Sequence, residues 1–178
     1  MNKVVEEILW RIYCATSDRV GGRNDIRFVL LNSIIKDARS FTGKQLNKAV
    51  YELTRQKLIK KKEYENSVLV SMSERGILRM INYKFRRLND KKEKWDNKWR
   101  MITFDIPNSY EKARKALVYR LKMGGFYEWQ KSVFLYPYDC REEVSGFTRL
   151  FKIEKYVHFG LVEFIDDQNK LEFHFKLK

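Results

Sequence analysis

The sequence predicts an α+β protein built from two domains, and three observations lead to this prediction. The 178 residues are 44% hydrophobic and 15% aromatic, which is enough apolar material for packed cores without disulfides. Apolar residues recur at helical spacing early in the chain, whereas aromatic and β-branched runs alternate with helical stretches later. Residues 84–100 carry eight basic side chains and few aliphatic ones, which indicates a helix end followed by a linker. We therefore expect domains at 1–90 and 98–178, joined by a linker at 91–97.

Positive charge is concentrated in the first part of the chain. Lys and Arg number 37 against 23 Asp and Glu, for a net charge of +14. Residues 1–100 hold 24 basic and 12 acidic side chains, whereas residues 101–178 hold 13 and 11. This asymmetry indicates a polyanionic partner, such as a nucleic acid, for the first domain. The alternative is a basic surface that has no partner.

Several classes of protein are excluded or disfavoured by what the sequence contains. Cys14 and Cys140 cannot form a disulfide framework, and no CxxC or Cys/His cluster offers a zinc site. The first residues lack the pattern of a signal peptide, and no apolar run is long enough to span a membrane. No glycine-rich phosphate loop, GxSxG or HExxH motif is present. We expect a cytoplasmic protein with no membrane partner.

The first domain is predicted to contain helices followed by a hairpin. Three helices come first: one over 3–16, a second whose apolar face is Phe28, Leu31, Ile34 and Ile35, and a third over 43–56. A turn with Asn24 or Asp25 as a helix cap separates the first two. Two extended runs around a tip at 65–67 then form a hairpin, and Ser73 caps a fourth helix. This order is typical of a winged helix-turn-helix, whose last helix before the hairpin enters the major groove of DNA.

The outward side of the 43–56 helix carries side chains suited to DNA. Lys and Arg pair with phosphates or guanine edges, and Asn can pair with adenine through two hydrogen bonds. Lysines on the first strand of the hairpin, the wing, are placed for phosphate contact. The expected DNA-binding residues are Lys44, Asn47, Lys48, Tyr51 and Arg55 on the helix, and Lys60, Lys61 and Lys62 on the wing. Alone, this face could be an ordinary solvated surface, but the helix order, the wing and the charge asymmetry favour DNA binding.

The second domain is predicted to follow the β-α-β-β-α-β order of a ferredoxin-like fold, with one extra strand. Proline and glycine residues separate its segments. The expected elements are a strand over 98–106, a helix over 109–123 capped by Ser109, strands over 126–129 and 132–136, a helix over 139–153, and strands over 156–164 and 171–177.

Asp105 is the residue of the second domain with the clearest chemical potential. It ends the first strand, just before Pro107. A carboxylate there can bind Mg²⁺ if a dimer partner supplies a second one, and the favoured alternative is that it caps the following turn. His158 and His174 are isolated in strand patterns and indicate no metal pair. Cys140 begins a helix without a catalytic His near it in the sequence, so we interpret it as structural.

Four runs in the second half resemble a known family. They are Trp95-Asp-Asn-Lys-Trp-Arg-Met-Ile-Thr-Phe-Asp-Ile-Pro107, Arg114-Lys-Ala-Leu117, Leu121-Lys-Met-Gly-Gly-Phe126 and Gln130-Lys-Ser-Val-Phe-Leu-Tyr-Pro-Tyr138. Together they resemble the middle domain of PaaX-type transcriptional repressors, which is itself similar to the CRISPR-associated Cas2 adaptation endonuclease. The winged helix precedes this domain as it would in such repressors. Longer members carry a further C-terminal domain, so ligand sensing through that domain is not expected of this chain.

The resemblance implies a homodimeric, sequence-specific regulator that binds double-stranded DNA and needs no cofactor. Two ferredoxin-like sheets would pack face to face, with their last strands exchanged or added across the interface. The two winged helices would then read a DNA site with two-fold symmetry.

The Cas2 likeness also implies an alternative function. In that family the aspartate ending the first strand is the proposed metal ligand, and Asp105 holds that position. The chain would then be a Mg²⁺-dependent endonuclease or a scaffold with an integrase partner. An RNA-binding module is a third reading, ranked last because the second strand pair lacks an RNP-like aromatic motif.

Overall fold

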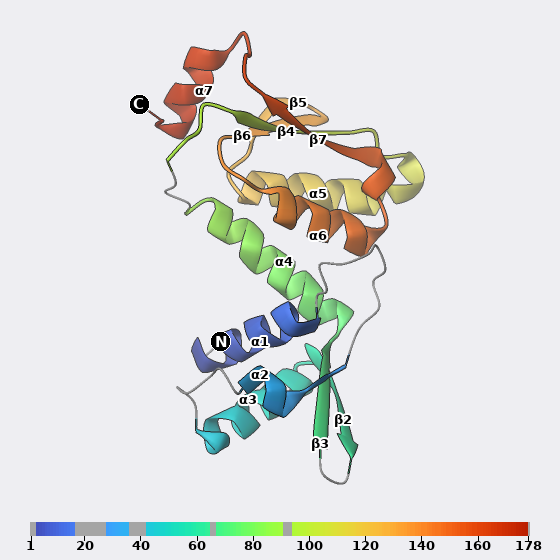
Figure 1. The fold of residues 1–178 in the computed structure, drawn as a ribbon. Coiled ribbons are helices and arrows are strands. Elements are labelled where there is room, and N and C mark those ends of the chain that lie inside the picture. The colour runs from blue at the N-terminus through green and yellow to red at the C-terminus, as the bar shows by residue number, and fades with distance from the viewer. Residues whose placement is uncertain (1–2, 17–27, 36–41, 65–66, 91–93, 178) are drawn as a thin grey trace. The chain divides into compact units, whose positions relative to one another are not determined.

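The chain combines helices and sheets in two compact units, in agreement with the α+β prediction (Figure 1). The computed structural model describes residues 3–16, 28–35, 42–64, 67–90 and 94–177. Unit 1 is Met1–Met80 and unit 2 is Ile81–Lys178, so the division falls inside helix α4 (Glu74–Leu88). Among the described residues, no helix has the length and apolar character needed to cross a membrane.

Unit 1 combines helices with a small antiparallel sheet. Strand order in the sheet is β1-β3-β2, and strands β2 and β3 form a hairpin where the sequence predicted one. The helices expected over 3–16 and 43–56 are confirmed to within one residue. The predicted turn near Asn24 and most of the hairpin tip lie outside the described residues. The elements are α1 (Lys3–Thr16), β1 (Val29–Leu30), α2 (Leu31–Ile35), α3 (Gly43–Arg55), β2 (Ile59–Tyr64), β3 (Ser67–Met72) and the first turns of α4.

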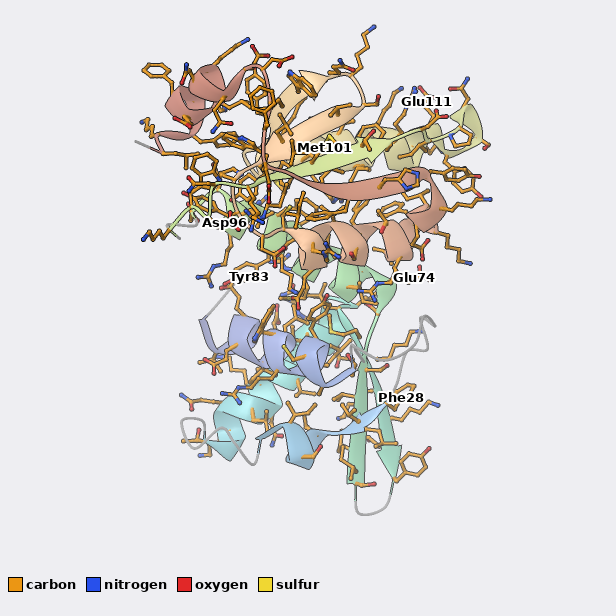
Figure 2. The ribbon with its side chains drawn as sticks, turned by 45° about the horizontal axis from the view of Figure 1, so that its top comes forward. Phe28, Glu74, Tyr83, Asp96, Met101 and Glu111 are labelled. Atoms are coloured by element: carbon orange, nitrogen blue, oxygen red, sulfur yellow. The ribbon has the colours of Figure 1, made fainter. Side chains whose placement is uncertain are left out.

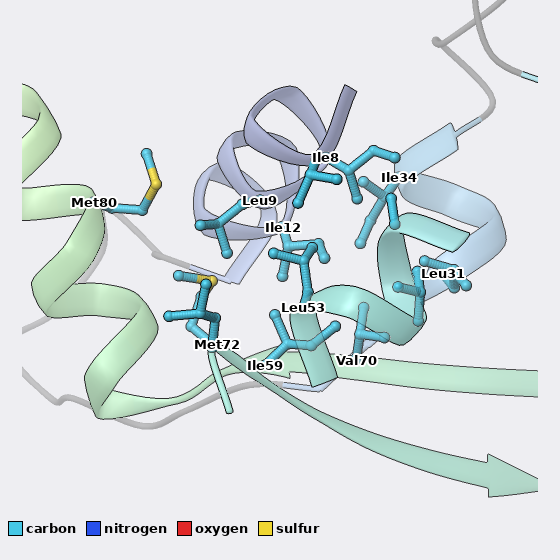
Figure 3. Packing of buried hydrophobic residues seen from close by; sticks show 14 residues of the cluster. Ile8, Leu9, Ile12, Leu31, Ile34, Leu53, Ile59, Val70, Met72 and Met80 are labelled. Atoms are coloured by element: carbon cyan, nitrogen blue, oxygen red, sulfur yellow. The ribbon is translucent and has the colours of Figure 1, made fainter. Parts of the chain in front are cut away.

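The core of unit 1 forms where α1, α3 and the sheet meet (Figure 3). Ile8, Leu9 and Ile12 lie on one side of α1, as their helical spacing predicts, and all three are buried. They belong to one cluster with Leu53 of α3 and Val70 of β3. Because this cluster holds the apolar side of α3, the opposite side of that helix faces outward.

Unit 2 contains a four-stranded sheet with the order β5-β6-β4-β7, in which every neighbouring pair is antiparallel. Helices α5 and α6 lie on one face of this sheet (Figure 1). Helix α7 packs Leu171 against Trp99 and Leu135 near one end of the sheet. After α4, the elements are β4 (Trp99–Phe104), a 3₁₀ turn (Asn108–Tyr110), α5 (Glu111–Met123), β5 (Tyr127–Gln130), β6 (Val133–Tyr136), α6 (Arg141–Phe151), a 3₁₀ turn (Glu154–Tyr156), β7 (Val157–Val162) and α7 (Gln168–Phe175).

The strand predicted over 171–177 is wrong, because α7 occupies most of that segment. Apolar side chains at Leu171, Phe173 and Phe175 alternate as in a strand, but the first and last are also one helical turn apart. Leu171 and Phe175 both pack in the cluster of Trp99, whereas Phe173 is 87% exposed. His174 therefore lies on a helix, and among the described residues β7 is the last strand.

Helix starts were predicted with mixed success. Ser73 caps α4 as expected, since its hydroxyl accepts a 3.0 Å hydrogen bond from the Gly76 N–H. Ser109 does not cap α5: that helix begins at Glu111, after a 3₁₀ turn, and its N-cap residue Tyr110 makes no side-chain cap hydrogen bond.

Candidate nucleic-acid interface

Local hydrogen bonds fix both ends of α3, the helix that carries most of the predicted DNA-binding residues. Thr42 and Gln45 form a capping box: the Gln45 N–H donates to the Thr42 hydroxyl at 3.3 Å, and the Thr42 N–H donates to the Gln45 side chain at 2.9 Å. After the helix, Lys57 adopts a left-handed φ of 56°. The Leu58 N–H then donates to the Leu53 carbonyl at 2.9 Å. The helix is therefore held in register with the wing that follows it.

The two sides of α3 differ sharply in burial. Ala49, Val50 and Leu53 are buried in the core of unit 1. Four predicted DNA-binding side chains lie on one exposed stripe, at spacings of three and four residues. Tyr51 in this stripe is 69% exposed. The structure thus brings together Lys44, Asn47, Lys48 and Tyr51 as one surface, which we call the α3 stripe.

Arg55 continues the α3 stripe, but its guanidinium is bound to Glu52. It donates to the two Glu52 carboxylate oxygens at 3.0 and 2.7 Å. The Gln56 amide donates to the same carboxylate at 2.6 Å. The hydrogen bond from Arg55, and next the one from Gln56, lower the pKa of Glu52 from 4.5 to about 2. Sequence reasoning missed this pair, although its spacing of three residues on a helix was a usable signal.

The three wing lysines are exposed but do not face the same way. Side chains alternate along β2, so Lys60 and Lys62 lie on one face and Lys61 on the other. Lys61 forms an ion pair with Glu63. The Lys62 ammonium lies 4.4 Å from the ring centroid of Phe28. Phe28 is labelled in Figure 2. Lys60 has no ion pair or ring contact among the described residues.

Asp105 lies in unit 2, at the edge of a surface hollow of about 690 Å³. Its carboxylate is exposed and makes no hydrogen bond to the described residues, so the cap expected of it is not seen. Its N–H donates to the Tyr156 carbonyl at 3.0 Å. The lining comes from the end of β4, one side of α5 and the β5–β6 turn, and its members are Phe104, Asp105, Ile106, Arg114, Lys115, Val118, Tyr119, Lys131 and Ser132.

Within one copy of the chain, the residues around Asp105 do not by themselves make a Mg²⁺ site. Magnesium is held through oxygen ligands, usually one or two carboxylates together with waters and substrate phosphates. Asp105 is the sole carboxylate among the lining residues, whereas Arg114, Lys115 and Lys131 supply three cations. In the described part of the chain, no group of three or more His, Cys, Asp or Glu side chains could hold a metal ion. We therefore assign no catalytic step to Asp105.

The conspicuous Trp95–Pro107 run has a structural role at its start. The Arg100 guanidinium donates to the Asp96 carboxylate at 2.8 Å and to the Pro137 carbonyl at 2.8 Å. The hydrogen bond from Arg100 lowers the pKa of Asp96. Trp95 packs on Trp99 with ring centroids 4.8 Å apart. These contacts anchor the segment that leads into β4, in which Trp99 is fully buried.

Comparison with known proteins finds a similarity for most of unit 2. No curated protein matches the chain. Residues 92–173 match the family model described as the PaaX protein central Cas2-like domain. The matched segment contains the β4 strand, Asp105 and most of α7. This segment is therefore similar to the central Cas2-like domain of PaaX proteins.

Proposed function

We propose that this protein is a homodimeric transcriptional regulator of the PaaX type that binds double-stranded DNA through unit 1. The observation that carries the proposal is the α3 stripe. Its four side chains combine cations for phosphates, an amide suited to adenine and an exposed tyrosine. No ion pair or side-chain hydrogen bond holds Lys44, Asn47 or Lys48 among the described residues, so these groups are available to a partner.

The topology of unit 1 supports a winged helix-turn-helix. Among the described residues, α1, α2 and α3 precede the β2–β3 hairpin, and β1 joins that hairpin in a small sheet of order β1-β3-β2. In this motif the helix before the wing enters the major groove, and the wing contacts the backbone. Lys60 and Lys62 share a face of β2 and are the wing residues we assign to phosphate contact. Lys61 is a weaker candidate because Glu63 partly neutralises it.

Unit 2 is the dimerisation domain in this proposal. Its β-α-β-β-α-β order and its sheet order support a ferredoxin-like fold. Helices α5 and α6 cover one face of the sheet (Figure 1). Ile102 and Phe104 of β4 are buried. Because side chains alternate along a strand, the half-buried Met101 and Thr103 lie on the opposite face of β4. This face, together with the similarity to a Cas2-like domain, supports a pair of sheets packed against each other.

Removal of the two stripe lysines tests the DNA-binding role. The full chain and the Lys44→Ala/Lys48→Ala variant would be titrated against a labelled mixed-sequence duplex of about 30 base pairs at several salt concentrations. We expect weaker binding and a log–log salt dependence whose slope is shallower by about two, because each lost phosphate contact removes about one unit.

A matched control makes this result specific. Arg75→Ala/Arg79→Ala removes two exposed cations at the same spacing on α4, and we expect its salt slope to stay close to that of the natural chain. Equal slopes for the stripe variant and the natural chain would contradict the proposed role of α3.

A further inference from the structure

We propose that the surface hollow beside Asp105 binds a phosphate group, in place of the divalent metal that the position of the aspartate suggests. This inference does not rest on the proposed DNA-binding function, because the residues that carry it all belong to unit 2. It follows from the arrangement of three cations around the hollow, from the lack of internal partners at two of them, and from the scaffold that holds them.

The cations of the hollow are mounted on regular structure. Arg114 and Lys115 lie on α5, whose opposite side is buried through Leu117 and Leu121. Lys131 lies in the turn between β5 and β6. That turn is tied to β4, because the Phe104 N–H donates to the Ser132 carbonyl at 3.1 Å. The three backbone segments that carry the charges are therefore positioned before any ligand arrives.

Two of the three cations are unneutralised. Arg114 and Lys131 make no ion pair or side-chain hydrogen bond among the described residues. Lys115 pairs with Glu111 at 2.7 Å, and this contact, with a smaller contribution from Arg114, lowers the pKa of Glu111. Asp105 is the one carboxylate among the residues that line the hollow. A guanidinium with open donors can bind a phosphate through two parallel hydrogen bonds, and an ammonium adds a second charged donor.

The rest of the lining suits a ligand larger than one phosphate. Phe104, Ile106 and Val118 supply apolar surface, and Tyr119 presents a ring that is 64% exposed. The volume of about 690 Å³ lies within the range of small-molecule sites. The phosphate can come from a phosphorylated small molecule or from a nucleic-acid backbone, and the chemistry of recognition is the same for both.

Titration calorimetry of the full chain with sodium pyrophosphate, in buffer without divalent metal, tests the inference. We expect saturable binding that becomes at least about tenfold weaker in Arg114→Gln/Lys131→Gln, since two charge-assisted contacts are lost. Lys94→Gln/Lys112→Gln removes two exposed charges of unit 2 that do not line the hollow. It should keep the affinity to within about twofold. Absence of saturable binding, or equal losses in both variants, would overturn the inference.

Asp105→Asn separates a phosphate site from a metal site. At a phosphate site the aspartate repels the ligand, so its removal should tighten pyrophosphate binding by about twofold or more. Binding that requires Mg²⁺ and disappears in Asp105→Asn would instead establish the metal site and overturn the proposal.

A DNA titration of Arg114→Gln/Lys131→Gln distinguishes the two sources of phosphate. If this variant loses pyrophosphate binding but keeps its DNA affinity, the ligand is a small phosphorylated molecule. If it loses both pyrophosphate binding and DNA affinity, the ligand is the nucleic-acid backbone. Lys44→Ala/Lys48→Ala should retain pyrophosphate binding, so failure of the DNA-binding proposal and failure of this one would be seen separately.

Discussion

Glu52 limits the charge that α3 presents to a partner. Its carboxylate holds Arg55, the last residue of the predicted DNA-binding set on this helix, through two hydrogen bonds. An incoming phosphate must therefore compete with Glu52 for the guanidinium. Lys44 and Lys48 form no ion pair among the described residues, although the charge of Lys48 also helps to lower the pKa of Glu52. A single residue thus divides the predicted contacts into available and internally neutralised groups.

The Glu52 carboxyl should remain ionised well into acid. Its folded pKa of about 2 lies below the ordinary 4.5, so the stabilising contribution is complete above pH 4.5 and is lost as pH falls toward 2. A ¹³C NMR titration of the carboxyl down to about pH 3.5 should find it still mostly charged. In Arg55→Gln the midpoint should move toward 4.5, because the hydrogen bond from Arg55 is the largest cause of the shift. An unchanged titration midpoint in that variant would contradict the role of Arg55 in lowering the pKa of Glu52.

Glu52→Gln should strengthen DNA binding, if α3 reads DNA as proposed. The substitution removes a negative charge beside the phosphates and releases Arg55. We expect a salt slope steeper by about one and an affinity several-fold higher near physiological salt. Anisotropy titrations at matched salt concentrations measure both quantities. Glu74→Gln, an exposed change of equal charge on α4, is the control. Weaker binding by Glu52→Gln would show that the pair orients Arg55 for contact.

At the scale of elements, the spacing of apolar residues predicted secondary structure best where that spacing fits a helix or a strand but not both. Helices α1 and α3 were predictable because their apolar residues fit a helix and no strand. The segment around Leu171 was not, because its alternation fits both, and packing against distant Trp99 decides between them. The α3 stripe was predictable for the same reason as its helix. The hollow was not, since Asp105, Arg114 and Lys131 come from three separate segments.

Helix capping gives an element-scale prediction. Thr42→Ala removes the hydroxyl half of the capping box on α3 and should destabilise the fold by about 1 kcal/mol. Ser109→Ala removes a hydroxyl of the same kind that caps nothing, and should change stability by less than about 0.5 kcal/mol. Urea unfolding followed by circular dichroism measures the difference, with each transition fitted separately if the two units unfold separately. Equal effects of the two substitutions would contradict the capping role of Thr42.

At the scale of the whole molecule, the proposal requires two copies. Two winged helices on one dimer bind a two-fold symmetric site with greater affinity than either has alone, because the second contact becomes intramolecular. Selection of binding sites from a random duplex pool should therefore enrich a two-fold symmetric sequence. Enrichment of a motif without symmetry would contradict a dimer that reads two half-sites.

Thr103→Arg tests whether the sheet of unit 2 forms the dimer. Thr103 pairs with Val133 and His158 on the neighbouring strands and lies on the sheet face away from α5 and α6. An arginine in each copy would bring buried like charges into a face-to-face interface. We expect the natural chain to sediment as a dimer and Thr103→Arg as a folded monomer, with DNA affinity lower by about 10²-fold. Ser109→Arg adds the same charge at an exposed turn and should remain dimeric. A Thr103→Arg protein that still sediments as a dimer would exclude the sheet face and move the interface elsewhere, with the exposed edge of β7 as the next surface to test.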